Sequence, residues 1–138
     1  MTSIDRLRFN MIEQQIRPWD VLDPQVLELL QVVRREQFVP PQHQGLAFVD
    51  MEVPLRGTPE EAVRTGQIML APKVEARMLQ EVKPAAHEKV LEVGAGSGHM
   101  AALLAGMAQR VVTLELEPEL VRMARENLQR AGIRNVEV

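Results

Sequence analysis

Three glycines at alternate positions form the stretch of the sequence best suited to bind a ligand. Gly94, Gly96 and Gly98 follow the apolar, strand-like residues 90–93 and precede a helix-forming run at residues 101–105. A strand that turns sharply into a helix leaves the first helical N–H groups available to a ligand. Glycine also leaves room because it has no Cβ. The pattern predicts a ligand site built from main chain, and a turn needed only for packing is the alternative.

A carboxylate after the next apolar run indicates which ligand this would be. Residues 111–115 read Val-Val-Thr-Leu-Glu, so a second strand-like run ends in Glu115. The dinucleotide fingerprint G-x-G-x-x-G would require a third glycine where this chain has His99. An acid at the end of the second strand of a doubly wound sheet can accept hydrogen bonds from two ribose hydroxyls. Glu115 is the candidate, Glu117 competes for the role, and a solvated charge is the alternative.

These two motifs resemble those of a known family of enzymes. Residues 91–98 (LEVGAGSG) and 112–115 (VTLE) are similar to the first two cofactor motifs of class I S-adenosylmethionine methyltransferases. Upstream segments narrow the resemblance to the protein-L-isoaspartate O-methyltransferase family, from about residue 9 to the end of the chain. Those segments are residues 11–17, 33–40, 47–50, 66–67 and 71–72.

The resemblance implies an enzyme that uses S-adenosyl-L-methionine to methylate isoaspartyl carboxylates of damaged proteins, a protein-repair reaction. It implies that Glu115 binds the ribose and that Leu116 forms an apolar wall for the adenine. The residues implied for the methionine and sulfonium part are Glu92, Gly94, Ala95, Gly96 and Gly98. The partner would be a protein or peptide that contains isoaspartyl residues.

The chain departs from the family pattern near the expected acceptor site. The family reads Gly-Gln-Thr-Ile-Ser before its proline, whereas this chain has Ile68 and Leu70 at the threonine and serine positions. The family serine is expected to orient the acceptor carboxylate, and Leu70 cannot donate a hydrogen bond, so the catalytic residue is unassigned. About eight residues are also inserted between Leu55 and Gly66. Two alternatives stay open: a relative with another acceptor or no catalysis, and a non-catalytic Rossmann-like interaction module.

Hydrophobic periodicity and helix-end signals predict the elements that would position these residues. Helices are expected from residue 3 or 5 to 17, from 24 to about 35, from 73 to about 82 and from 118 to about 131. Residues 41–58 read as irregular or hairpin structure with short strands at 47–49 and 52–55, and a helical turn is expected at 59–64. The cap of the first helix is expected at Ser3 or Asp5.

The resemblance implies an α/β fold: the N-terminal half of a Rossmann-like class I methyltransferase fold, with parallel strands ordered 3-2-1 and helices. An N-terminal helical and loop extension, residues 1–72, would cover the cofactor and help form the substrate groove, or would only cap one face of the sheet. Residues 73–138 would form the first half of the cofactor-binding domain, and the chain ends as the third strand begins. The open sheet edge leaves two alternatives: the 138 residues belong to a longer chain, or the chain dimerises through that edge.

Composition narrows the function classes further. The net charge is −3 with no basic block, which argues against a nucleic-acid surface. The absence of cysteine removes disulfides and thiolate metal sites, and the three histidines have no partners at metal-ligand spacing, so no metal is expected. No apolar run approaches membrane-spanning length and the N-terminus is charged. The sequence therefore predicts a cytoplasmic protein with no membrane partner.

Overall fold

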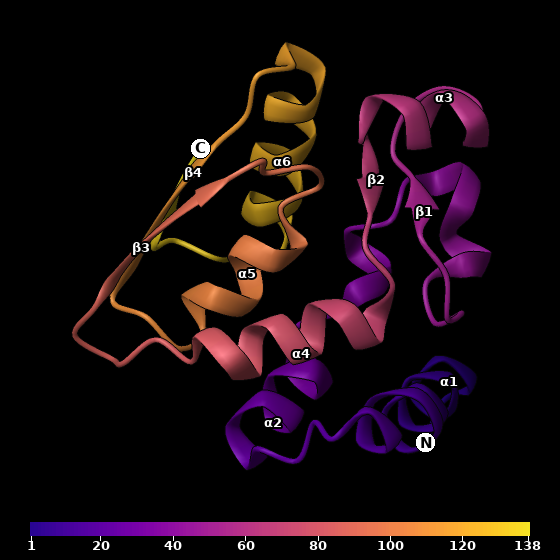
Figure 1. Cartoon of the computed structure of the whole chain (residues 1–138), viewed down its shortest axis with the longest axis vertical. Coiled ribbons are helices and arrows are strands. Elements are labelled where there is room, and N and C mark those ends of the chain that lie inside the picture. The colour runs from indigo at the N-terminus through magenta and orange to yellow at the C-terminus, as the bar shows by residue number, and fades with distance from the viewer. The chain divides into compact units, whose positions relative to one another are not determined.

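The computed structural model describes residues 1–138 and divides them into two compact units, Met1–Val82 and Lys83–Val138 (Figure 1). The sequence places the boundary ten residues earlier, after residue 72 at the start of helix α4 (Pro72–Val82), whereas in the structure α4 belongs to the first unit. Gln80 of α4 shows why. Its Oε1 accepts hydrogen bonds from the main-chain N–H groups of Leu22 and Asp23 at 2.9 and 3.1 Å, and its Nε2 donates to the Asp20 carbonyl at 2.8 Å.

The first unit begins with helices whose ends follow ordinary capping rules. Helix α1 (Ser3–Met11) is capped by Thr2, which forms a reciprocal capping box with Asp5. The predicted cap at Ser3 or Asp5 is therefore wrong, and the observed cap is one residue before Ser3. A π-helical segment (Ile12–Ile16) and a 3₁₀ turn (Arg17–Trp19) continue α1. Helix α2 (Pro24–Val32) starts after the predicted cap Asp23 and ends before the predicted Arg35.

A two-stranded hairpin follows, and of the two predicted strands only the one at residues 52–55 is part of it. Strand β1 (Val53–Pro54) pairs antiparallel with β2 (Ile68–Met69), and helix α3 (Pro59–Thr65) connects them. The predicted strand at residues 47–49 is wrong. After the 3₁₀ segments at Arg35–Gln37 and Pro41–Leu46, the N–H groups of Ala47 and Val49 donate to nearby carbonyls of the same turn. Those donors are therefore used locally rather than in a ladder.

The second unit is a parallel three-stranded sheet with connecting helices. Its elements in chain order are β3 (Lys89–Val93), α5 (His99–Ala105), β4 (Arg110–Leu114), α6 (Pro118–Arg130) and β5 (Val136–Glu137). The order β3-β4-β5, parallel throughout, confirms the predicted 3-2-1 arrangement. The longest helix, α6, has 13 residues. None of the helices combines the length and apolar character needed to cross a membrane.

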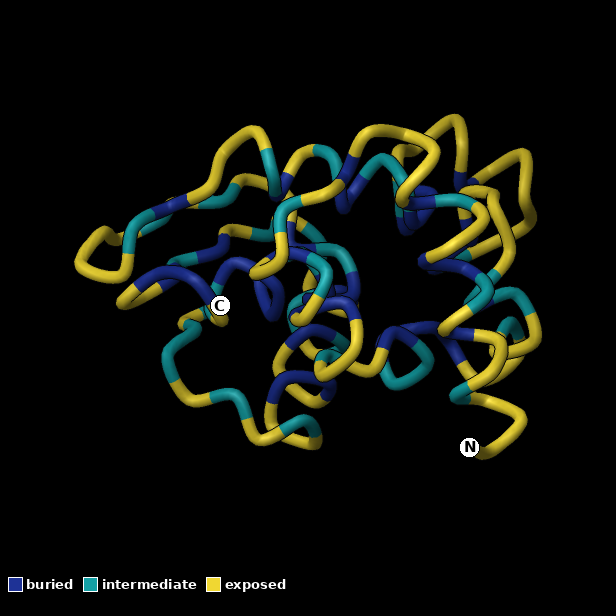
Figure 2. Tube along the Cα trace, turned by 90° about the horizontal axis from the view of Figure 1, so that it is seen from below, coloured by how far each residue is buried: buried dark blue, intermediate teal, exposed yellow.

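Burial varies along the Cα trace (Figure 2), and it alternates along the strands of this sheet. Val111 and Thr113 of β4 are fully buried, and α5 contributes buried Leu103 and Leu104 to the same core. The alternate positions Leu91 and Val93 of β3 are 64% and 79% exposed. The strand order makes β3 an edge strand of this sheet. The exposed Leu91 and Val93 side chains form an apolar surface on one of its faces.

Candidate functional site

The turn between β3 and α5 requires glycine at each of its three glycine positions. Gly94, Gly96 and Gly98 have φ angles of +97°, +55° and +88°, the left-handed region that other residues rarely adopt. A Cβ on Gly98 would lie 3.3 Å from the Ala124 carbonyl oxygen, so Gly98 also allows close packing against α6. A Cβ on Gly94 would meet nothing within 4 Å. Packing thus explains Gly98, while Gly94 borders open space.

The main chain of this turn is tied to the neighbouring strand. The N–H groups of Gly94 and Ala95 both donate to the Leu114 carbonyl, at 2.8 and 3.1 Å. The Gly98 N–H donates to the Ala95 carbonyl at 2.9 Å, and Gly98 then serves as the N-cap of α5. The turn is therefore held in one conformation by the end of β4, which fixes its position relative to the residues that follow that strand.

The first of those residues, Glu115, contacts the glycine turn. Its Oε1 accepts the Gly96 N–H at 2.9 Å, and its Oε2 accepts the Glu117 N–H at 3.1 Å. The sequence predicted that an acid after the second strand would lie beside the turn, and the structure brings Glu115 and Gly96 together. Leu116 is 91% exposed, so its side chain is accessible to a ligand. The assignment of Glu115 to ribose and Leu116 to adenine stays a prediction.

Glu92 is held from the adjacent strand. Thr113 Oγ1 donates to Glu92 Oε1 at 2.6 Å, and the two residues are direct partners in the parallel register of β3 and β4. Thr113 is fully buried, and Glu92 is partly buried. A carboxylate with a fixed orientation therefore lies two residues before Gly94.

Two of these supporting residues are absent from the sequence-based site. Thr113 sits inside an apolar run, and only the register of the strands reveals its partner. Asn127 of α6 donates from Nδ2 to the Ser97 carbonyl at 2.9 Å and fixes the turn from the helix side. Asn127 lies seven residues, or about two helical turns, after the buried Leu120, so both residues are on the same side of α6. A polar residue on the core-facing side of a helix could have indicated a buried hydrogen bond.

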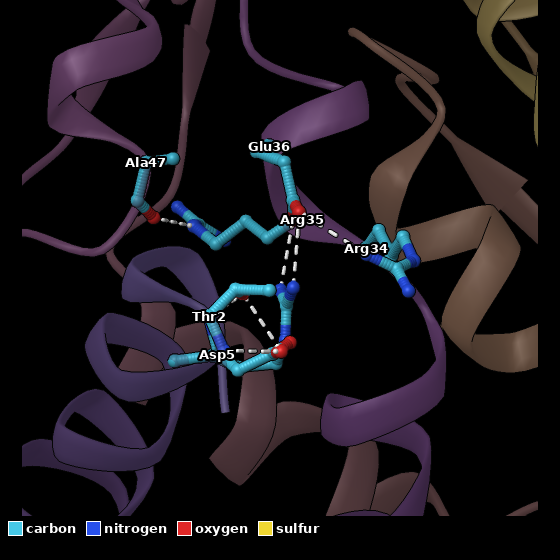
Figure 3. Close-up of polar contacts among 7 residues, drawn as sticks. Thr2, Asp5, Arg34, Arg35, Glu36 and Ala47 are labelled. Atoms are coloured by element: carbon cyan, nitrogen blue, oxygen red, sulfur yellow. Dashed lines mark hydrogen bonds and ion pairs between the residues drawn. The ribbon is translucent and has the colours of Figure 1, made fainter.

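The segment expected to face the acceptor lies in the first unit. Figure 3 shows the contact of Arg35 with the Ala47 carbonyl, and the same guanidinium donates to the Leu70 carbonyl just after β2. Arg35 donates to the Leu70 carbonyl and to the Ala47 carbonyl, each at 2.8 Å, and it pairs with the buried Glu75 carboxylate of α4. One buried guanidinium therefore joins the end of β2, the 47–49 turn and α4. Ile68 pairs with Pro54 in the hairpin.

A second ion pair lies next to it along the chain. Arg8 donates to both oxygens of Glu36 at 2.8 and 2.9 Å, with Arg8 almost completely buried. Burial alone would raise the pKa of Glu36, but hydrogen bonds from Arg8 and the charges of Arg8 and Arg34 outweigh it and hold this pKa below its usual value. The hydrogen bond with Glu36 in turn raises the pKa of Arg8. This pair contributes to stability rather than to the predicted site.

A hollow of about 630 Å³ lies elsewhere in the second unit, between the end of α6 and β5. It is lined by residues such as Arg125, Ile133 and Val138 and by none of the predicted cofactor residues. This hollow is therefore separate from the candidate site at the glycine turn.

Comparison with solved structures supports the fold. A structure from Plasmodium falciparum, named as a protein-L-isoaspartate O-methyltransferase in complex with S-adenosyl-L-homocysteine, superposes with a TM-score of 0.73. The match covers 99% of this chain and 62% of that one at 19% identity. Another protein-L-isoaspartate O-methyltransferase gives a TM-score of 0.72 over 97% of this chain and 40% of that one, at 22% identity. The chain therefore has the N-terminal half of the Rossmann-like fold of these methyltransferases.

Sequence comparison identifies the family. Protein-L-isoaspartate O-methyltransferases from Aeropyrum pernix and a Picosynechococcus species are 43% and 42% identical to this chain, each over 94% of its length. The matches cover 48% and 55% of those proteins, so the chain spans about half the length of the curated relatives it matches. The family model described as Protein-L-isoaspartate(D-aspartate) O-methyltransferase matches residues 7–138. This chain belongs to that family.

Proposed function

We propose that this chain provides the S-adenosyl-L-methionine site of an enzyme that methylates isoaspartyl carboxylates in damaged proteins. The observation that carries the proposal is the contact between the Glu115 carboxylate and the Gly96 N–H at the end of parallel strands. Family membership supports the choice of cofactor and acceptor. A chain without cysteine needs no oxidising compartment, which supports placing the enzyme in the cytoplasm.

The residues present fit this cofactor. Gly94 borders open space, so a ligand can approach the main chain of the turn closely. Glu115 offers two carboxylate oxygens for the ribose hydroxyls, and exposed Leu116 offers an apolar surface for the adenine. The main chain at Ala95, Gly96 and Gly98 would lie against the methionine part, with Glu92 beside it. The N–H groups of these three glycine-turn residues already donate within the chain, so the turn would contribute mainly close approach.

Methyl transfer to a carboxylate requires mainly that the two reactants are held in the right positions. When bound, the cofactor supplies a methyl group activated by its sulfonium. A carboxylate acceptor is already ionised at pH 7, because such groups have pKa values of about 4, so no general base is needed. The chain would hold the acceptor oxygen in line with the methyl group and exclude water. A site without a proton-transferring residue is consistent with that reaction.

Two measurements test the proposal in order. Titration calorimetry of the chain with S-adenosyl-L-homocysteine should give saturable 1:1 binding, since product and cofactor share the adenosine and amino-acid groups. Transfer of labelled methyl from S-adenosyl-L-methionine to an isoaspartyl peptide, with the matched aspartyl peptide as control, then tests the acceptor. Absence of binding would favour the non-catalytic interaction module.

Leu70 supports a second candidate, a methyltransferase with another acceptor or none. Its carbonyl is fixed by Arg35, but its side chain cannot orient a carboxylate by hydrogen bonding. If the chain binds cofactor without methylating the isoaspartyl peptide, the variant Leu70→Ser separates the possibilities. Activity gained by Leu70→Ser would show that the leucine excludes this acceptor. Continued inactivity would favour a different acceptor or loss of catalysis.

A further inference from the structure

The hydrogen bond between Thr113 and Glu92 has the character of a charge-assisted contact. Its length of 2.6 Å falls in the range of about 2.5–2.7 Å for a hydroxyl that donates to a carboxylate. Thr113 is fully buried, and its place opposite Glu92 is fixed by the pairing of β3 with β4. The hydroxyl therefore sets the orientation of the Glu92 carboxylate from inside the protein.

The orientation of Glu92 matters because of where β3 ends. Glu92 precedes the glycine turn by two residues, and the methionine part of the cofactor, assigned to this end of the turn, carries a positively charged amino group. A carboxylate has about four acceptor positions, so one hydroxyl donor does not saturate such a group. Glu115, the other carboxylate at this edge, is the residue proposed for the ribose, and it lies after β4 rather than at the end of β3.

We propose that Thr113 is a positioning residue: its buried hydroxyl orients the Glu92 carboxylate to accept the α-amino group of S-adenosyl-L-methionine. This inference rests on the proposed function, because it requires the cofactor to bind at the glycine turn. Thr113 itself is inaccessible to ligand and acts through Glu92. The effect should therefore be specific to ligands that carry the amino group.

A comparison of two ligands and two variants tests this. Thr113→Val keeps the β-branched shape and removes the hydroxyl, whereas Thr113→Ser keeps the hydroxyl. The ligands are S-adenosyl-L-homocysteine and 5′-methylthioadenosine, which lacks the amino-acid part. We expect Thr113→Val to weaken S-adenosyl-L-homocysteine roughly tenfold, the size of one hydrogen bond, and to leave 5′-methylthioadenosine unchanged. Thr113→Ser should bind both ligands like the parent chain.

Equal weakening for both ligands, or equal impairment of the serine and valine variants, would overturn the proposal, because either result indicates a purely structural role. Glu92→Gln should weaken S-adenosyl-L-homocysteine selectively, and adding Thr113→Val to it should have no further effect; additive losses would also overturn the coupling. If Thr113→Val does not fold, Thr113→Ala replaces it. Failure of the parent chain to bind S-adenosyl-L-homocysteine would remove the proposed function and this inference together, whereas normal binding by Thr113→Val would remove only this inference.

Discussion

Glu115 contacts the glycine turn in the structure and is also the residue proposed to bind the ribose. Both of its oxygens accept main-chain N–H groups within the protein, one from the glycine turn and one from the start of α6. Its carboxylate is therefore held in one orientation before any ligand arrives.

Replacement of this carboxylate should weaken cofactor binding. We expect Glu115→Ala to reduce the binding free energy of S-adenosyl-L-homocysteine by about 1–3 kcal/mol, because the ribose hydroxyls would lose their acceptor. Calorimetry provides the measurement, and Glu126→Ala, an exposed carboxylate on α6, is the matched control. Unchanged affinity in Glu115→Ala would remove this residue from the site.

The Arg8–Glu36 pair predicts a specific dependence of stability on pH. Because the pKa of Glu36 is lowered in the folded protein, its contribution is complete above the usual glutamate value of 4.5 and is lost as the pH falls through the lowered folded value. Denaturant unfolding between pH 6 and roughly pH 3 should show this decline. Glu36→Gln should show a smaller decline, whereas Glu13→Gln, which removes an exposed pair, should follow the parent chain. Parallel curves for all three proteins would contradict the prediction.

Among single residues, the sequence predicted those that belong to a local motif. The glycine spacing and the acid after the second strand predicted that Glu115 faces the same crevice as the turn, and the structure brings Glu115 into contact with Gly96. Thr113 and Asn127 were not predicted, because their partners, Glu92 and the Ser97 carbonyl, lie 21 and 30 residues away along the chain. Such contacts depend on strand register and helix packing, which no local pattern encodes.

At the scale of elements, Arg35 joins the segment after β2, the 47–49 turn and α4 through buried polar contacts. Removing one member of a buried ion pair costs about 3–5 kcal/mol, so we expect Arg35→Leu to lower the free energy of unfolding by that amount. Arg35→Lys keeps a charge but cannot reach three acceptors with one planar group, so it should rescue only part of the loss. Denaturant titration gives both values.

The neighbouring arginine provides the control for this prediction (Figure 3). Arg34 has a side chain that is 57% exposed and lies 3.9 Å from Glu36. Arg34→Leu should change the free energy of unfolding by less than about 1 kcal/mol, as expected for an exposed ion pair. If Arg34→Leu and Arg35→Leu were equally destabilising, the buried contacts of Arg35 would not be the cause.

Helices were predicted more accurately than the hairpin. Proline at the first helical position and a capping residue before it marked α2 and α3, and apolar spacing marked α4 and α6. The hairpin pairs residues separated by the whole of α3, so the partner of β1 was assigned to nearby residues 47–49 instead of to β2. Pairing across an insertion leaves no local signal, and two-residue strands have too little periodicity to show one.

At the scale of the whole molecule, the division after Val82 depends on contacts that the sequence does not display. The glutamine and arginine side chains of α4 bond to main-chain groups near Trp19 and Leu22, and these contacts assign the helix to the first unit. The three parallel strands were predicted because a family pattern covers them continuously. The functional role of the first 72 residues stays a prediction.

The open face of the sheet leads to a prediction about self-association. Leu91, Val93 and Leu114 are at least half exposed on strands β3 and β4, and β3 is an edge strand. Such surfaces promote association through edges or apolar faces. We expect the sedimentation coefficient to rise with concentration, and Val93→Lys to reduce that rise at unchanged stability. A monomer at all concentrations would contradict dimerisation through this edge.

The two hydrogen bonds of Glu115 also have a kinetic consequence. If ribose hydroxyls take the place of the Gly96 and Glu117 N–H groups, ligand entry is an exchange of partners in which the chain must first release its own donors. In a stopped-flow experiment the observed rate would then level off at high ligand concentration, and its ceiling would report how fast that release occurs. The Glu115 contacts themselves would then add little to the heat of binding, since the bonds broken and the bonds made are of the same kind.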